Sequence, residues 1–256
     1  MRILQREPRI EEFFEKKVII SDPEESFFDA CRKIFVSKSK KIPVVRNRKL
    51  IGIYTVMDLI YSFNPSLKVR EFMKRNLITI GLEENISRAI SLMKVFNIGA
   101  LLVTSGEYFK GIITERSILE NIEKMNYSSD KKASDIMTPK PFVIKDDFSL
   151  WDAFQIMKNM KLKRFPVVDK DEKVVGIFHA EILLKHASLF NFSKEMMKNK
   201  RISEVVSSNY EVISGDETIS EIIRKFLKDR YAVLVVDNSE TLLGIITERD
   251  IIQKVL

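Results

Sequence analysis

The chain has 256 residues, of which 45% are hydrophobic and 31% are charged, and its formal net charge is +7. This is the composition of a folded protein, and no apolar run approaches the roughly 18 residues of a membrane span, which excludes a transmembrane helix. The N-terminal stretch lacks the apolar core of a secretory signal, and the single cysteine, Cys31, excludes an intrachain disulfide. We therefore expect a cytoplasmic protein in which Cys31 is a buried thiol on a helix face.

The positive charge is concentrated in the first half of the chain. Residues 1–127 hold 22 basic and 16 acidic residues, whereas residues 128–256 hold 21 and 20. Between Arg32 and Lys49 there are eight basic residues and no acidic one. Such a stretch can attract nucleic acid, an anionic nucleotide or an acidic protein, or it can be an ordinary solvated face.

The first predicted elements, in chain order, are a short strand at 18–21, a helix, a strand from Ile42 and a strand that carries Gly52. The helix is indicated by apolar residues at i, i+3, i+4 and i+7, beginning at Phe27. The same order of elements then recurs three times. The later helix stripes begin at Ile86, Leu150 and Ile219, and the later strands carry Gly111, Gly176 and Gly244.

Each of these glycines opens a related phrase: GIYT, GIIT, GIFH and again GIIT, at gaps of 59, 65 and 68 residues. A second helix begins a few residues after each phrase, so every unit reads β-α-β-β-α in roughly 55 to 60 residues. The predicted fold class is α/β (α+β), with four copies of one unit. Because a unit of this size cannot bury its apolar face alone, the four must pack together, and ligand sites are expected at the seams between them.

The order of strand, helix, PVV-type strand and G-h-h-T-x-x-D phrase resembles the cystathionine-β-synthase (CBS) domain. Four copies would cover almost the whole chain. The resemblance implies that consecutive copies form two pseudo-symmetric pairs, often called Bateman modules, in a disc-like arrangement. The layout is similar to that of the adenylate-sensing γ subunit of AMP-activated kinase, which carries four copies in one chain.

The resemblance also gives domain boundaries, with the polar stretch at residues 124–133 as the link between the pairs. The first pair would span 1–127, with repeats at about 9–63 and 66–125, and the second 128–256, with repeats at about 130–187 and 199–255.

The residues that follow the repeated glycine are the strongest candidates for ligand binding. Thr55 and Asp58 in the first copy, and Thr247 and Asp250 in the fourth, have the spacing of a helix cap with an acid at the third position. The same geometry suits a ligand, because a helix N-terminus favours phosphate and a carboxylate can accept hydrogen bonds from a ribose diol. By resemblance, the threonines would approach the phosphate and the aspartates would hold the ribose hydroxyls. Capping and binding are compatible.

The other two copies depart from this pattern. The second has Thr114 but Ser117 in place of the acid, and the third has His179 and Ile182, so that both groups are lost. An isoleucine cannot accept a hydrogen bond from ribose. We therefore expect at most two ribose-holding sites, one in each pair.

The resemblance assigns two further stretches to the ligand. The start of the second strand would form the wall for the base, and the residues before the first strand would also touch the ligand. The wall residues are Lys41, Ile42 and Pro43 in the first copy and Arg230, Tyr231 and Ala232 in the fourth. The leading stretches run from Thr138 to Val143 in the third copy, from Ser207 to Val212 in the fourth and from Glu15 to Ile20 in the first, where no hydroxyl is present.

Arg116 and Arg249 follow the repeated threonines of copies two and four by two residues. They either neutralise phosphate across the pseudo-dyad of a pair or lie in solvent in a first helical turn. Neither histidine has metal-ligand spacing around it, and neither a Walker-type loop nor a nucleophile elbow is present in the sequence. No metal, cofactor or catalytic residue is therefore expected.

The leading hypothesis is a non-enzymatic regulatory module that binds AMP, ADP or ATP in clefts between repeats and passes the change to an unidentified protein partner. S-adenosylmethionine and methylthioadenosine are alternatives, because both keep the adenosine. A second hypothesis is a nucleic-acid- or protein-binding adaptor that uses the basic stretch between Arg32 and Lys49. No membrane partner is expected, and both a monomer and a homodimer fit the sequence.

Overall fold

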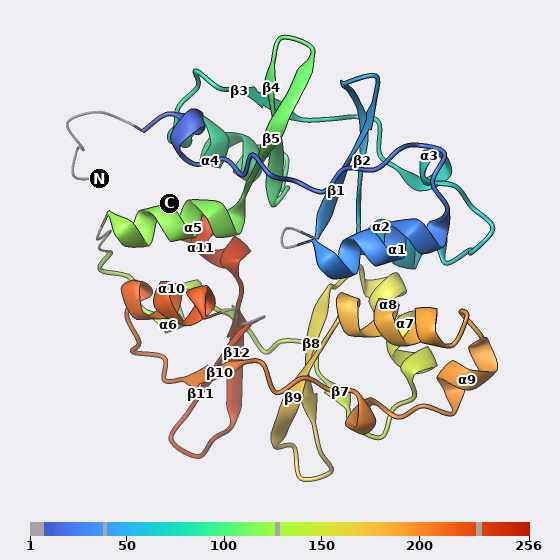
Figure 1. The fold of residues 1–256 in the computed structure, drawn as a ribbon. Helices are drawn as coiled ribbons and strands as arrows, with labels where there is room; N and C mark the ends of the chain where they lie inside the picture. Colours follow the sequence, from blue (N-terminus) through green and yellow to red (C-terminus); the bar gives the residue numbers. More distant parts are fainter. Residues whose placement is uncertain (1–7, 38–39, 126–128, 229–231) are drawn as a thin grey trace.

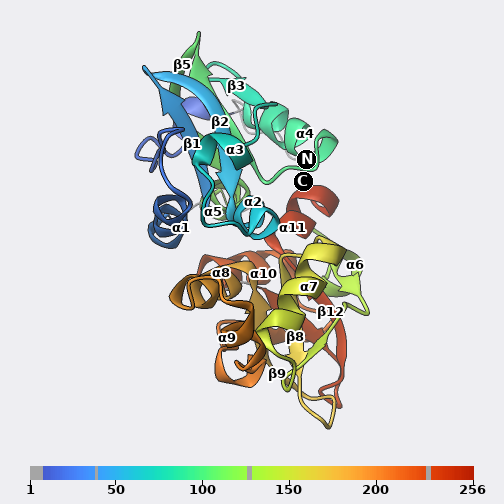
Figure 2. The same cartoon turned by 90° about the vertical axis from the view of Figure 1, so that its right-hand side faces the viewer.

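The computed structural model describes residues 8–37, 40–125, 129–228 and 232–256. The four repeats occupy the four corners of a flattened molecule, with repeats 1 and 2 in the upper half of Figure 1 and repeats 3 and 4 in the lower half. Figure 2, at right angles to this view, shows the narrow edge of the molecule and the two halves lying one above the other. The disc expected from the repeat pattern is thus formed by one chain.

The four repeats share a helix, two consecutive strands and a second helix, in that order. Repeat 1 contains α1 (Phe27–Val36), β1 (Lys41–Arg46), β2 (Lys49–Thr55) and α2 (Val56–Ser62), and repeat 2 contains α3 (Val69–Phe72), β3 (Thr79–Gly81), α4 (Ile86–Val95), β4 (Ala100–Ser105), β5 (Tyr108–Thr114) and α5 (Glu115–Lys124). Repeat 3 contains α6 (Ala133–Ile136), β6 (Thr138–Pro139), β7 (Ile144–Lys145), α7 (Leu150–Met160), β8 (Arg164–Val168), β9 (Val174–His179), α8 (Ala180–Leu189) and α9 (Lys194–Lys198). Repeat 4 contains β10 (Glu211–Ile213), α10 (Ile219–Leu227), β11 (Val233–Val236), β12 (Leu242–Ile246) and α11 (Glu248–Lys254), and short 3₁₀ turns, η1 (Ile10–Glu12) and η2 (Ile202–Glu204), precede repeats 1 and 4.

The first long helix of each repeat begins where the sequence predicts it. Ser26, Asn85, Ser149 and Thr218 are the N-caps of α1, α4, α7 and α10, and their side chains accept hydrogen bonds from backbone N–H groups of the first turn. A polar N-cap satisfies donors that the helix cannot pair internally. The apolar stripe that follows each cap then fixes which face of the helix is buried.

In each repeat the second and third strands form an antiparallel hairpin, and the first strand is parallel to the second. The predicted first strand of repeat 1, at residues 18–21, is an exception. It is reduced to a single bridge between Ser21 and Val44, and no strand is formed there. The hairpins of repeats 1 and 2 join through β2 and β5 into one five-stranded sheet.

The segment that precedes each repeat crosses to the other repeat of its half. α3 leads repeat 2 but packs against repeat 1, and α6 leads repeat 3 but packs against repeat 4. Backbone hydrogen bonds that anchor the four crossings join Ile10 to Glu84, Val69 to Glu25, Ala133 to Glu217 and Ile202 to Phe148. Each half of the chain is therefore interlocked by two exchanged segments.

This crossing explains the repeated glycine. The crossing segment passes directly over the strand that carries the glycine, so that a Cβ at Gly244 would lie 2.5 Å from Sδ of Met137. A Cβ at Gly111 would overlap the backbone oxygen of Glu15. The glycine thus makes room for the crossing segment, whose backbone is the nearest neighbour at Gly111 and whose methionine side chain is the nearest at Gly244.

The two main hydrophobic cores run across the halves. One core joins the helices of repeat 1 to those of repeat 3, with α8 packed against α1 and α2, and the other joins repeat 2 to repeat 4, with α5 packed against α10 and α11. These helix layers lie next to each other in Figure 1. A smaller core, formed by Ile177, Ala232, Leu234 and Ile245, lies between the sheets of repeats 3 and 4.

Candidate functional site

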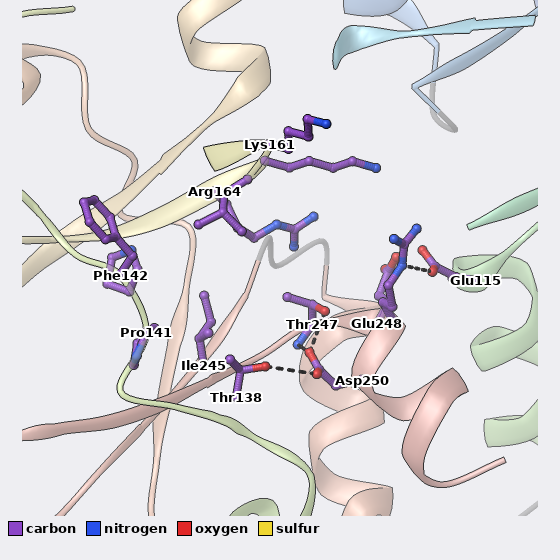
Figure 3. Close-up of a pocket in the computed structure, with 14 residues that line it drawn as sticks. Glu115, Thr138, Pro141, Phe142, Lys161, Arg164, Ile245, Thr247, Glu248 and Asp250 are labelled. Atoms are coloured by element: carbon purple, nitrogen blue, oxygen red, sulfur yellow. Dashed lines mark hydrogen bonds and ion pairs between the residues drawn. The ribbon is translucent and has the colours of Figure 1, made fainter. Parts of the chain in front are cut away.

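A cavity of about 330 Å³ lies where repeats 3 and 4 meet (Figure 3). This volume is in the range of sites that hold small organic ligands. The side chains around it are of three kinds: polar groups at the start of α11, apolar side chains along the strands, and cations. The lining residues are Glu115, Thr138, Pro141, Phe142, Lys161, Leu162, Lys163, Arg164, Pro166, Ile245, Thr247, Glu248, Arg249 and Asp250.

The polar end is built on the N-terminus of α11. Oδ2 of Asp250 accepts hydrogen bonds from the backbone N–H and the hydroxyl of Thr247, at 2.8 and 2.7 Å, which closes the helix cap. Oδ1 of the same carboxylate points toward Thr138, whose hydroxyl lies 3.3 Å away (Figure 3). One carboxylate oxygen therefore serves the helix and the other is directed at the cavity.

The hydroxyl of Thr138 comes from repeat 3, although Asp250 belongs to repeat 4. The crossing segment carries it there, because β6 pairs with β12 so that Thr138 lies opposite Ile245. The sequence predicted both residues for ligand contact but in separate copies, and the structure brings them into one cavity.

Apolar side chains form the opposite walls. Pro141 and Phe142 come from the crossing segment, and Pro166 and Ile245 lie on β8 and β12. Phe142 is 44% exposed and stands edge-on to the buried ring of Phe165, with 5.8 Å between ring centroids. These walls are suited to a flat apolar ring, since aromatic and aliphatic surfaces lose water on contact with it.

The third feature of the cavity is a cluster of cations. Lys161, Lys163 and Arg164 come from the turn and strand that follow α7, and Arg249 comes from the first turn of α11. Lys163 is one of the residues that line this concave region. Its partial desolvation, together with the charges of Lys41 and Arg249, lowers the pKa of Lys163 to about 8. An anion entering the cavity would relieve this repulsion.

Two acidic residues at the cavity link it to repeat 2. Arg249 pairs with Glu115 at 3.0 Å, and Arg116 pairs with Glu248 at 2.6 Å, so the starts of α5 and α11 exchange ion pairs reciprocally. Gly99 leaves space for the Glu115 carboxylate, which a Cβ would overlap. Arg249 lines the cavity, whereas Arg116 does not and also donates to the backbone oxygen of Phe226. Of the two arginines predicted for phosphate, only Arg249 is therefore placed to reach a ligand in this cavity.

The equivalent cleft of repeat 1 keeps the predicted helix cap. Asp58 accepts from the backbone and hydroxyl of Thr55 at 2.8 and 2.7 Å, as its counterpart does in repeat 4. The residue that the crossing segment brings to it is Lys74, whose Nζ lies 2.9 Å from Oδ1 of Asp58.

The helix starts of repeats 2 and 3 lack the carboxylate. Thr114 and Ser117 cap α5 by bonding to each other, and the hydroxyl of Thr114 lies 3.4 Å from Oε1 of Glu15. His179 pairs with Glu181 at 2.7 Å. Although burial raises the pKa of Glu181, its contacts with His179 lower it to about 2. In both repeats, therefore, the position of the missing aspartate goes together with hydrogen bonds among the polar side chains that remain at the helix start.

The remaining predicted residues that the structure describes are not among those that line the cavity. Ile42 is fully buried in the core shared by repeats 1 and 3, and Ala232 is fully buried between the sheets of repeats 3 and 4. Both side chains are close-packed in these cores, and the contact of these two residues with a base stays a prediction. Tyr231, like Arg230, lies outside the described residues. Five further predicted residues do not line the cavity: Lys41, Pro43, Val143, Ser207 and Val212.

The site also contains charged residues that the sequence did not single out, namely Lys161, Lys163, Arg164, Glu115 and Glu248. A signal was available for Arg164, because RFPVV in repeat 3 aligns with KIPVV in repeat 1, whose Lys41 was chosen. For Glu115 there was none, since its contact with Arg249 joins two repeats that are far apart in the sequence.

Four of the eight basic residues between Arg32 and Lys49 pair with acids that flank the stretch in space. Lys33 pairs with Glu25 at 2.5 Å, and Lys49 pairs with Glu107 at 2.6 Å. Arg32 and Arg46 likewise pair with Asp29 and Glu24. About half of the positive charge of this stretch is therefore compensated locally, and Lys38 lies outside the described residues.

Among the described residues, none of the helices is sufficiently long and apolar to cross a bilayer. The same part of the chain holds no group of three or more His, Cys, Asp or Glu side chains that is able to ligate a metal ion.

Comparison with known proteins places this fold and site in a family. A model of the CBS domain matches residues 10–64, 69–124, 133–189 and 202–256. The chain belongs to the CBS domain family, with four copies, and the resemblance inferred from the repeated phrases is confirmed.

The match to one relative extends over the whole molecule. An uncharacterised protein of Methanocaldococcus jannaschii is 24% identical over 93% of this chain and 95% of its own length. Its crystal structure, in which the protein is proposed as an archaeal homologue of the AMP-activated kinase γ subunit, superposes with a TM-score of 0.85 over 96% of this chain and 99% of that chain at 23% identity. A conserved protein of Pyrococcus horikoshii gives a TM-score of 0.69 over 97% of this chain and all of that chain at 18% identity. At these identities, the structural likeness shows the shared fold.

Another relative is an enzyme. Inosine-5′-monophosphate dehydrogenase of Methanocaldococcus jannaschii is 26% identical to 51% of this chain, but the match covers only 26% of that protein.

Proposed function

We propose that this chain is a non-enzymatic regulatory module that binds a phosphorylated adenosine, AMP, ADP or ATP, in the cavity between repeats 3 and 4. The observation that carries the proposal is the division of one cavity into a hydrogen-bonding end, apolar walls and a cationic cluster. An adenine nucleotide has the same three parts in ribose, base and phosphate.

The ribose is held at the start of α11. Oδ1 of Asp250 accepts hydrogen bonds from the two ribose hydroxyls, and the hydroxyl of Thr138, 3.3 Å from that oxygen, completes the contact. Hydrogen bonds to a charged carboxylate are each worth about 1.5–3 kcal/mol, so Asp250 supplies the larger share of ribose recognition.

The base lies between the apolar walls, with Phe142 and Pro141 on one side and Ile245 on the other. Adenine buries a flat surface there and loses water from both of its faces. Phe142 is sufficiently exposed to stack on the ring.

The cationic cluster favours a phosphate over the other adenosine compounds. Four cations, Lys161, Lys163, Arg164 and Arg249, line the cavity together with three carboxylates, Glu115, Glu248 and Asp250. S-adenosylmethionine carries a sulfonium cation next to the ribose, and methylthioadenosine carries no charge, so neither compensates these cations. AMP, ADP and ATP differ in phosphate charge, and the cluster sets the preference among them.

The ligand acts by differential binding. A phosphate that pairs with Arg249 competes with Glu115 for the same guanidinium, and Glu115 belongs to repeat 2. Occupancy therefore weakens one of two reciprocal ion pairs between the halves of the disc and shifts their relative placement, which a protein partner reads.

Isothermal titration calorimetry with AMP, ADP, ATP and methylthioadenosine tests this proposal. We expect the three nucleotides to bind and methylthioadenosine to bind at least about tenfold more weakly, because it forms no charge-assisted contacts with the cluster. Equal affinity for methylthioadenosine and AMP would remove the phosphate from the mechanism, and the lack of heat with any of the four compounds would refute the proposal.

The affinity for AMP should fall as the pH rises above 8. With its pKa lowered to about 8, Lys163 is protonated at pH 7 and loses its proton above pH 8. A bound phosphate favours the protonated form, so binding takes up protons and is strongest below pH 8. The AMP phosphate has a second pKa of about 6, so its negative charge rises slightly between pH 7 and 9 and cannot cause a loss of affinity. Titrations at pH 7.0 and 9.0, with the Lys163→Gln variant as the control that should lose the pH dependence, provide the measurement.

A further inference from the structure

The crossing segments place a different side chain at the same position of each of the four clefts. This position lies opposite the residue that follows the repeated glycine, and its backbone is fixed by the bridge between the two strands. The four pairs are Thr138 with Ile245, Lys74 with Ile53, Glu15 with Ile112 and Ser207 with Ile177. The four positions thus share a backbone geometry and differ in the side chain, which contacts the residues at the helix start for Thr138, Lys74 and Glu15.

Two of the clefts, those of repeats 1 and 4, have the carboxylate that a ribose requires, and they differ at this position. In repeat 4 the cavity-facing Oδ1 of Asp250 meets the neutral hydroxyl of Thr138. In repeat 1 the corresponding Oδ1 of Asp58 is held by the ammonium group of Lys74 at 2.9 Å. Since Oδ2 of each aspartate is already used in the helix cap, Oδ1 is the acceptor that a ribose needs.

Asp250 also has a lysine partner, but this one approaches from another side. Lys254 lies one turn further along α11, 3.1 Å from Oδ1, and its Nζ is anchored by the backbone oxygens of Ile136 and Met137. It does not line the cavity. The cation that balances Asp250 is therefore not one of the cavity-lining residues, whereas Lys74 occupies the register position that Thr138 holds in the other half.

The setting of the repeat 1 pair makes Lys74 an effective competitor. The Asp58 side chain is only 5% exposed, so little water screens its charge, and the pair is fixed at one end by backbone hydrogen bonds between Lys74 and Ile53 at 2.8 and 3.0 Å. A ribose hydroxyl is neutral and must displace an ammonium ion to reach Oδ1. The four-carbon stem of lysine also fills space that threonine leaves open.

We infer that Lys74 closes the repeat 1 cleft to adenosine phosphates by occupying Asp58, so that each chain binds a single nucleotide, in the cavity between repeats 3 and 4. This inference rests on the proposed function and adds to it the residue that selects which cleft is used. The other two clefts have Ser117 and Ile182 where the carboxylate would be. Both intact Thr-x-x-Asp phrases cap a helix, and only the one with Asp250 also binds the nucleotide.

The test is an exchange of the two residues, with AMP as the probe and the number of bound molecules per chain measured by calorimetry and equilibrium dialysis. The wild-type protein should bind one AMP, and Asp250→Asn should remove it while Asp58→Asn should not. Lys74→Thr should bind two, and adding Asp58→Asn to that variant should return the number to one. Thr138→Lys, which creates the reverse change, should weaken binding at the Asp250 site at least about tenfold.

Lys74→Arg is the matched control, because it keeps the cation and should leave the number at one. The side chain of Lys74 is 62% exposed, so its replacement by threonine should not prevent folding, and a melting curve checks this. Two AMP molecules on the wild-type protein, one of them lost in Asp58→Asn, would overturn the inference, as would a single AMP on Lys74→Thr. If the wild-type protein bound no AMP that depended on Asp250, the proposed function itself would fail, which is a different result.

Discussion

Replacing Asp250 by asparagine should weaken the binding of AMP about a hundredfold. The cavity-facing Oδ1 would lose its charge, and in one amide orientation it would be an NH₂ group that cannot accept a hydrogen bond from ribose. Losing two charge-assisted hydrogen bonds costs about 3 kcal/mol, and each 1.4 kcal/mol corresponds to a factor of ten in the dissociation constant. Calorimetric titration of both proteins with AMP measures the change.

The matched control is Asp58→Asn, which alters the same position of the equivalent helix start in repeat 1. Both substitutions disturb a helix cap and should each cost about 1 kcal/mol of stability. Comparable melting temperatures for the two variants, with a loss of AMP affinity in Asp250→Asn alone, would separate ligand contact from capping. An Asp250→Asn protein with wild-type affinity would show that this carboxylate does not touch the ligand.

Replacing Gly111 by alanine should lower the free energy of unfolding by about 3 kcal/mol. The new Cβ would overlap the backbone oxygen of Glu15 and lie 2.6 Å from Cδ2 of Phe14. The crossing segment cannot withdraw without breaking its backbone hydrogen bonds between Glu15 and Ile112, at 2.8 and 3.1 Å. Overpacking of this kind costs about 1–3 kcal/mol or more, and a rigid backbone neighbour puts this position at the upper end. Urea denaturation followed by circular dichroism gives the value.

Gly81→Ala is the control for the loss of a glycine as such. Gly81 ends β3 in the same repeat, and a Cβ there would meet only the Cγ of Glu84, at an ordinary 3.7 Å. Its effect should lie within about 1 kcal/mol of zero, because alanine also restricts the unfolded chain. If the two variants were equally stable, the close approach of the crossing segment to β5 would not be the reason for glycine at position 111.

Most of the fold could be predicted from the sequence because the same pattern of apolar residues and glycine recurs in four repeats. A single apolar stripe or a single Gly-Ile phrase is ambiguous, but the stripes that begin at Phe27, Ile86, Leu150 and Ile219 each lie on a helix whose buried face contacts a core. Residues 18–21 were predicted as a strand, which was wrong, since an apolar run shows burial but does not show whether a neighbouring strand lies in register to pair with it.

The crossing segments were beyond the reach of sequence patterns. Hydrophobic periodicity predicts a single helix or strand and the face that it buries. It does not predict which of two similar repeats the segment before a repeat packs against. Thr138 was therefore assigned to the third copy and Asp250 to the fourth, with no indication that they meet at 3.3 Å. For the same reason Lys74, which separates the two intact phrases, gave no signal, because its importance comes only from the carboxylate beside it.

The way the cores are shared between halves has a consequence for symmetry. Repeat 1 shares its core with repeat 3 and repeat 2 with repeat 4, so neither half has a closed interior, and a half produced alone would leave a helix layer in water. A homodimer of two identical two-repeat chains could bury the same helix layers, but every site would then occur twice with the same residues. Joining the halves in one polypeptide removes this constraint, so each corner of the disc is free to diverge. A threonine at one corner and a lysine at its counterpart are the outcome of that freedom.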